Sequence, residues 1–101
     1  MQKQSRVAVI SMIIDIAEQD STAAINALLH ECREYIIGRM GIPYREEGLS
    51  IINVVLDAPM DVISALSGKL GRLRGVSAKA VYSKLPAAEN DYTQNEKGQQ
   101  T

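Results

Sequence analysis

The chain has 101 residues, of which 46% are apolar, and this size suits one domain with one hydrophobic core. Eleven Lys and Arg residues against twelve Asp and Glu residues leave a formal net charge of −1. This balance lacks the basic excess that is typical of an autonomous nucleic-acid-binding domain. The single cysteine, Cys32, excludes an internal disulfide framework and favours a reducing, cytoplasmic location. We expect no membrane partner, because Ser11 and Asp15 interrupt the N-terminal apolar run.

The first predicted elements are a strand and an amphipathic helix. Arg6–Ile16 is rich in Val and Ile and predicts a strand. Residues 19–21 supply turn and N-cap chemistry, so the helix is expected to begin near Ser21 and to fray around Arg33–Tyr35. Its apolar residues recur at intervals of three and four, which is typical of a core-facing stripe. They are Ile25, Leu28, Leu29, Cys32 and Ile36.

Two further strands are expected to form a hairpin. Tyr35–Tyr44 contains two glycines and a proline, which favour an irregular edge strand with bulges. The charged turn Arg45–Gly48 ends in a glycine that can take a positive φ angle. Leu49–Asp57 is therefore predicted to return as the third strand.

A second helix is expected from Pro59 to about Leu73, because proline is tolerated in the first helical turn. Asp57 or Asp61 would complement its positive end, and Gly75 stands where a helix stop is needed. The core stripe of this helix comprises Val62, Ile63, Leu66, Leu70 and Leu73.

The chain is expected to end with a fourth strand and a tail. Val76–Ser83 predicts the strand, which completes a single domain over residues 1–85. Residues 86–101 contain no Val, Ile, Leu, Met or Phe, so we expect a disordered polar tail. The order β-α-β-β-α-β predicts an α+β, ferredoxin-like sandwich, with a four-stranded antiparallel sheet and both helices on one face.

The first and third strands are apolar on both alternating faces, although two helices cover only one side of a sheet. If Ala8, Ile10, Met12 and Ile14 pack under the helices, an apolar patch remains on the other face; the reverse assignment is the alternative. Such a patch predicts self-association into dimers or tetramers. Its predicted interface residues are Val7, Val9, Ser11, Ile13, Leu49, Ile51, Asn53 and Val55.

The polar members of this patch, Ser11 and Asn53, have two interpretations. They either hydrogen-bond across a dimer or recognise a small ligand at the subunit interface, and the first interpretation is favoured because buried polar groups need partners.

Catalytic and metal-binding groups are sparse. His30 and Glu34 lie one predicted helical turn apart and could contact one metal ion, but Cys32 falls on another side of the helix. We favour a solvated His–Glu pair and expect no metal and no cofactor. Cys32 is interpreted as core filler, since no basic neighbour is evident in the sequence. The serines lack a plausible base, so no catalytic residues and no enzymatic activity are predicted.

Gly68–Gly71 has the G-x-x-G pattern of KH-type RNA-binding loops, with Lys69, Arg72 and Arg74 adding positive charge. The leucine spacing of the second helix continues through it. Close helix packing at the small residues is therefore favoured over nucleic-acid contact.

Four segments together resemble the iron-only hydrogenase system regulator family, over about Arg6–Leu85. They are Ile63–Arg72, Gly75–Val76, Leu28–His30 and Ile42–Glu47. The resemblance implies an ACT-like or nickel-responsive-regulator-like domain used for effector sensing and oligomerisation, with a regulatory or accessory role around hydrogenase assembly.

Several features of those relatives are not expected here. About five residues precede the first strand, so we expect no ribbon-helix-helix and no direct DNA binding. Ile51–Leu56 has neither His nor Cys for a nickel site, and Glu18–Thr22 has no glycine for an amino-acid effector. The favoured function is non-enzymatic sensing. The domain would associate with copies of itself and would bind a small effector. The alternative is a structural adaptor that binds a hydrogenase-maturation protein through Lys69, Arg72 and Arg74.

Overall fold

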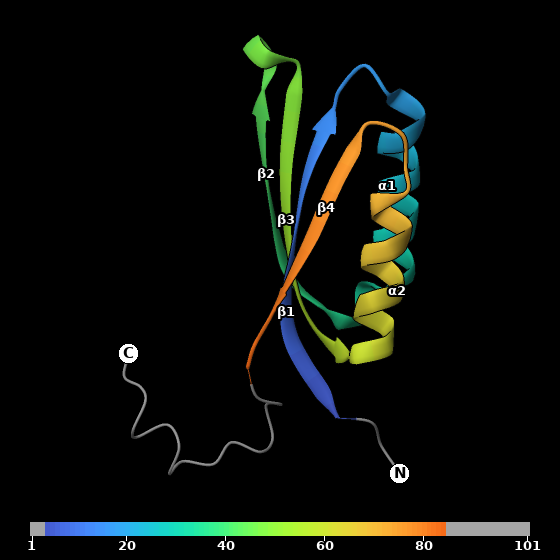
Figure 1. The fold of residues 1–101 in the computed structure, drawn as a ribbon, viewed down its shortest axis with the longest axis vertical. Coiled ribbons are helices and arrows are strands. Elements are labelled where there is room, and N and C mark those ends of the chain that lie inside the picture. The colour runs from blue at the N-terminus through green and yellow to red at the C-terminus, as the bar shows by residue number, and fades with distance from the viewer. Residues whose placement is uncertain (1–3, 85–101) are drawn as a thin grey trace, which may run out of the picture.

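The structure is a computed structural model that describes residues 4–84. These residues form a β-α-β-β-α-β sandwich, with one four-stranded antiparallel sheet and two helices on one of its faces (Figure 1). The predicted ferredoxin-like α+β fold is therefore confirmed. The predicted tail, residues 86–101, lies outside the described residues. Neither helix within residues 4–84 has the length and apolar character needed to cross a membrane.

The sheet has the strand order β2-β3-β1-β4. Its centre is formed by β1 (Ser5–Asp15) and β3 (Leu49–Pro59), which pair antiparallel along their whole length. The edges are β2 (Ile36–Tyr44) and β4 (Val76–Tyr82). The two central strands are the two whose sequences are apolar on both faces. The register of β2 is irregular between residues 36 and 38, which confirms the predicted bulged edge strand.

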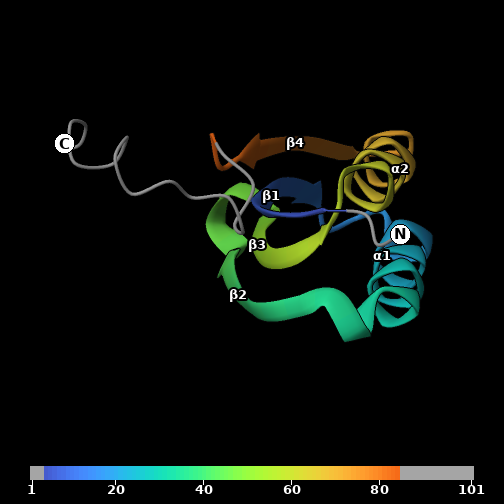
Figure 2. The same cartoon turned by 90° about the horizontal axis from the view of Figure 1, so that it is seen from below.

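The core lies between the sheet and the helices α1 (Gln19–Glu31) and α2 (Met60–Gly71), which Figure 2 shows on the same side of the sheet. Alternate residues of β1 face this core and are at most 2% exposed, as predicted. The largest fully buried side chains are Ile10, Met12, Ile25, Val54, Leu56, Ile63 and Leu70. Both amphipathic stripes therefore reach one continuous core.

The first helix starts two residues before Ser21, which is therefore not its N-cap as predicted. The helix begins at Gln19 and has no side-chain cap, while Ser21 lies inside it and is only 5% exposed. The Ser21 hydroxyl donates to the carbonyl oxygen of Arg74 at 2.7 Å, so it connects α1 to the α2–β4 turn. The helix ends at Glu31. A 3-10 turn over Arg33–Tyr35 follows it, close to where fraying was predicted, and Ile36 already belongs to β2.

The boundaries around the second helix also differ from the prediction. Of the two carboxylates predicted to complement the positive end of the helix, Asp61 lies in the first turn of α2, whereas Asp57 stays in β3 opposite Val7 of β1. Pro59 is the N-cap of α2, and the helix ends at Gly71 rather than near Leu73. The smaller differences in β1 and β4 are one residue at their ends.

Two glycines in the connections have positive φ angles, as their predicted turn roles require. Gly48 closes the β2–β3 turn at 71° and Gly75 precedes β4 at 74°. They differ in their surroundings. A Cβ atom on Gly48 would meet nothing within 4 Å, whereas one on Gly75 would lie 2.7 Å from Cγ of Glu18.

This difference gives a matched pair of substitutions. Gly48→Ala should lower the free energy of unfolding by about 1–2 kcal/mol, because only the left-handed backbone is penalised. Gly75→Ala should lower it by about 1–3 kcal/mol more, because Glu18 must also move. Urea denaturation of both variants measures the two losses. Equal losses would contradict the close packing at Gly75.

Candidate functional site

The side of the sheet that the helices leave uncovered carries a continuous set of apolar residues, which we call the open face. Residues directly opposite each other in antiparallel strands share a face of the sheet. The β1–β3 register therefore places every predicted interface residue on this side, opposite or next to one another. They are Val7, Val9, Ser11 and Ile13 of β1, and Leu49, Ile51, Asn53 and Val55 of β3.

The open face is larger than the sequence analysis predicted. The β2–β3 register adds Met40, Ile42 and Tyr44, and the β1–β4 register adds Lys79 and Val81. Met40 is 56% exposed and Val81 is 66% exposed. The alternation of residues 40, 42 and 44 was visible in the sequence. It was missed because the glycines and proline of this segment dominated its interpretation.

A polar row crosses the middle of the open face. The registers place Met40, Asn53, Ser11 and Lys79 side by side on the four strands. The Ser11 hydroxyl donates to Oδ1 of Asn53 at 2.7 Å. These two residues therefore already pair within one chain, while hydrogen bonds across a dimer stay a prediction. The row places a hydrogen-bonded pair and an amine between apolar residues, and Asp15 and Asp57 lie on the same face at the two ends of the central strands.

His30 and Glu34, which could contact one metal ion if they shared a helix, do not lie on one helix. His30 is in the last turn of α1, whereas Glu34 lies in the 3-10 turn beyond the end of that helix. Among residues 4–84, no three His, Cys, Asp or Glu side chains gather as a metal site would require.

Cys32 is half-buried at the end of α1 and packs against the core. Burial raises the pKa of its thiol, and the carboxylates of Glu31 and Glu34 raise it further. Lys69 of α2 lowers the pKa but does not reverse the shift. This lysine is a basic neighbour that the sequence analysis missed, because the two residues are distant in the chain. Together these effects raise the pKa of Cys32, which favours the unreactive thiol form over the thiolate, as predicted.

The three predicted partner-binding cations lie in different settings. Lys69 lines a hollow of about 190 Å³ between α1 and α2, together with Cys32. Arg72 folds back along its own helix, where its guanidinium lies over Gly68. Arg74 follows the end of α2 and its carbonyl oxygen accepts the hydrogen bond from Ser21.

The G-x-x-G pattern is helical, as favoured in the sequence analysis, since residues 68–71 lie in α2. At Gly71 the helix packs against Ala78 of β4, and at Gly68 the side chain of Arg72, the C-cap of the helix, covers the helix surface.

Comparisons with known proteins identify a family that this chain matches. Residues 6–80, from β1 into β4, match the family described as "TM1266-like: Iron-only hydrogenase system regulator, putative". Among solved structures, the chain is similar to the uncharacterized protein TM1266 from Thermotoga maritima, with 38% sequence identity and a TM-score of 0.77. The similarity covers 80% of this chain and 100% of that chain. No curated protein matches the chain.

The charges around Cys32 predict that substitutions of two residues close to it change its thiol pKa in opposite directions. Glu31→Gln should lower the thiol pKa, because it removes a negative charge, whereas Lys69→Gln should raise it. The rate of iodoacetamide alkylation follows the thiolate fraction. As the pH is raised, this rate should increase at a lower pH than in the wild type for Glu31→Gln, and at a higher pH than in the wild type for Lys69→Gln. Identical pH profiles for the two variants would contradict this arrangement of charges.

Proposed function

This chain belongs to the iron-only hydrogenase system regulator family, and from that premise we propose that it is a non-enzymatic, ACT-like regulatory domain that self-associates through its open face. The described fold is a single sheet with two helices. Regulation by such a domain would act through assembly and ligand binding rather than through chemistry on a substrate. A cytoplasmic location would keep Cys32 reduced.

The open face is the observation that supports self-association. Its central strands present Val9, Ile13, Ile51 and Val55 away from the core, and β2 and β4 extend the apolar surface on both sides. Contiguous apolar patches of this kind are rare on soluble monomers and mark interaction surfaces. A second copy offers an apolar surface of the same shape, so a two-fold arrangement would cover both copies at once.

The polar row supports a small effector held between two such copies. Ligand sites are mostly apolar and contain a few well-placed polar groups. Ser11, Asn53 and Lys79 would supply these groups at the middle of the interface, with Met40 beside them. An effector with a hydrogen-bonding or anionic group fits this set.

A structural adaptor is the second candidate function. In that case a hydrogenase-maturation protein would bind α2, and the supporting observation is Lys69 at the hollow between the helices. A partner bound there would leave the open face to serve assembly alone.

Val9→Lys tests the proposed assembly. Val9 lies opposite Val55 and Val81, so the substitution would place a charge at the centre of the interface. Burying that unpaired charge should cost about 3 kcal/mol or more, which weakens the assembly by more than about 100-fold. Native mass spectrometry at micromolar concentration should show a multimer for the wild type and a monomer for the variant.

Ser64→Lys is the matched control, because Ser64 is exposed on α2 on the opposite side of the sheet. It should retain the multimer, and circular dichroism should confirm that both variants are folded. A monomeric wild type, or the same multimer for Val9→Lys, would overturn the proposed assembly. A multimer that retains a discrete extra mass would support an effector, whereas a bare multimer would favour the adaptor.

A further inference from the structure

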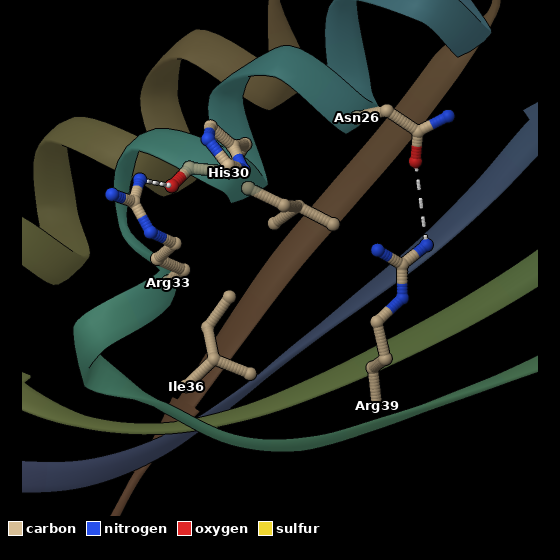
Figure 3. Close-up of a pocket in the computed structure, with 6 residues that line it drawn as sticks. Asn26, His30, Arg33, Ile36 and Arg39 are labelled. Carbon is tan, nitrogen blue, oxygen red and sulfur yellow. Dashed lines mark hydrogen bonds between the residues drawn. The ribbon is translucent and has the colours of Figure 1, made fainter.

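A second surface feature lies on the helix side of the sheet, at the edge where α1 meets β2. It is a hollow of about 340 Å³, shown in Figure 3. Its lining residues are Asn26, Leu29, His30, Arg33, Ile36 and Arg39. The open face is on the other side of the sheet, so this hollow is independent of the proposed assembly.

The sheet register explains how Arg39 reaches the hollow. Arg39 lies opposite Val54, which in turn lies opposite Ile10. Val54 and Ile10 are fully buried under the helices, so Arg39 continues a core-facing row at the edge strand. Arg39 itself is exposed, so it lies beyond the core at the rim of the sheet. It brings a charged group to the boundary between α1 and β2.

A second arginine, Arg33, lines the other side of the hollow, and its guanidinium is turned toward the end of α1 (Figure 3). Arg33 donates from Nη1 to the carbonyl oxygen of His30 at 2.9 Å. This bond places a positive charge at the negative end of α1, so it offsets part of the repulsion that this helix end exerts on an anion. Figure 3 shows Arg33 and Arg39 flanking Ile36, with His30 and Asn26 approaching from the helix.

The donors of Arg39 are only weakly committed within the protein. Its Nη2 lies 3.5 Å from Oδ1 of Asn26, at the long limit for a hydrogen bond. A guanidinium carries five N–H donors in a planar fork that matches carboxylate and phosphate oxygens. In the described part of the chain, no Asp or Glu lines this hollow. The described lining therefore contains two arginines and no carboxylate that would balance their charge.

We propose that this hollow binds a small organic anion that carries carboxylate or phosphate groups. Arg39 would hold its oxygen atoms, Arg33 would add positive charge at the rim, and the amide of Asn26 and the imidazole of His30 would add polar contacts. Leu29 and Ile36 would pack against its carbon skeleton. The volume lies within the range of small-molecule sites and exceeds what one inorganic ion fills.

Titration of the full chain with citrate and with inorganic phosphate tests this site. Two-dimensional NMR should show that one of the probes shifts the backbone signals of Asn26, His30 and Arg39, and isothermal titration should give its dissociation constant. Citrate alone would identify a carboxylate site, and phosphate alone would identify a phosphate site. Binding of neither probe would overturn the proposal. Shifts confined to Ser11 and Lys79, or to Lys69 and Arg72, would also overturn it.

Arg39→Gln should weaken binding of the active probe by about tenfold or more, since it removes charged hydrogen bonds. Arg39→Lys should recover only part of that loss, because lysine keeps the charge but lacks the fork. Arg45→Gln is the matched control, as it removes the same charge from the exposed β2–β3 turn. Equal affinities for the Arg39→Gln and Arg45→Gln variants would overturn the site. The subunit number of Arg39→Gln should equal that of the wild type, which separates this test from that of the open face.

Discussion

The antiparallel pairing of β1 with β3 is the constraint on which the rest of the structure depends. The two strands are paired over all eleven residues of β1, from Ser5 opposite Pro59 to Asp15 opposite Leu49. A shift of one residue would exchange the two faces of a strand. Because both faces are apolar, packing against the helices alone distinguishes them weakly. The polar pair formed by Ser11 and Asn53 adds a specific contact, since its 2.7 Å hydrogen bond requires these residues to lie opposite each other.

The two helices cover one side of this sheet, and two different surfaces result. On the uncovered side, the apolar alternation of the central strands continues onto β2 and β4 and creates the open face. On the covered side, the edge strand β2 extends to the boundary of α1, where Arg39 ends a buried row. The proposed assembly surface and the proposed anion site therefore lie on opposite sides of the sheet.

Long-range contacts determine the chemical roles of several polar side chains. The Ser21 hydroxyl lies within a helix and donates to the carbonyl of Arg74, 53 residues away, instead of capping the helix. The thiol of Cys32 has a raised pKa because burial and Glu31 outweigh Lys69, which comes from the other helix. In both cases the local sequence identifies the group, while the packing of distant elements selects its partner.

The sequence by itself determined the α+β fold and the two-sided apolar character of the first and third strands. Periods of two and of three to four residues report directly which faces of strands and helices are apolar. Only the tertiary structure decided the pairing of Ser11 with Asn53, the extension of the open face over Met40 and Val81, and the placement of Arg33 and Arg39 at one hollow. These features depend on strand register and helix position. Both are set by contacts between segments far apart in the chain, which local periodicity does not encode.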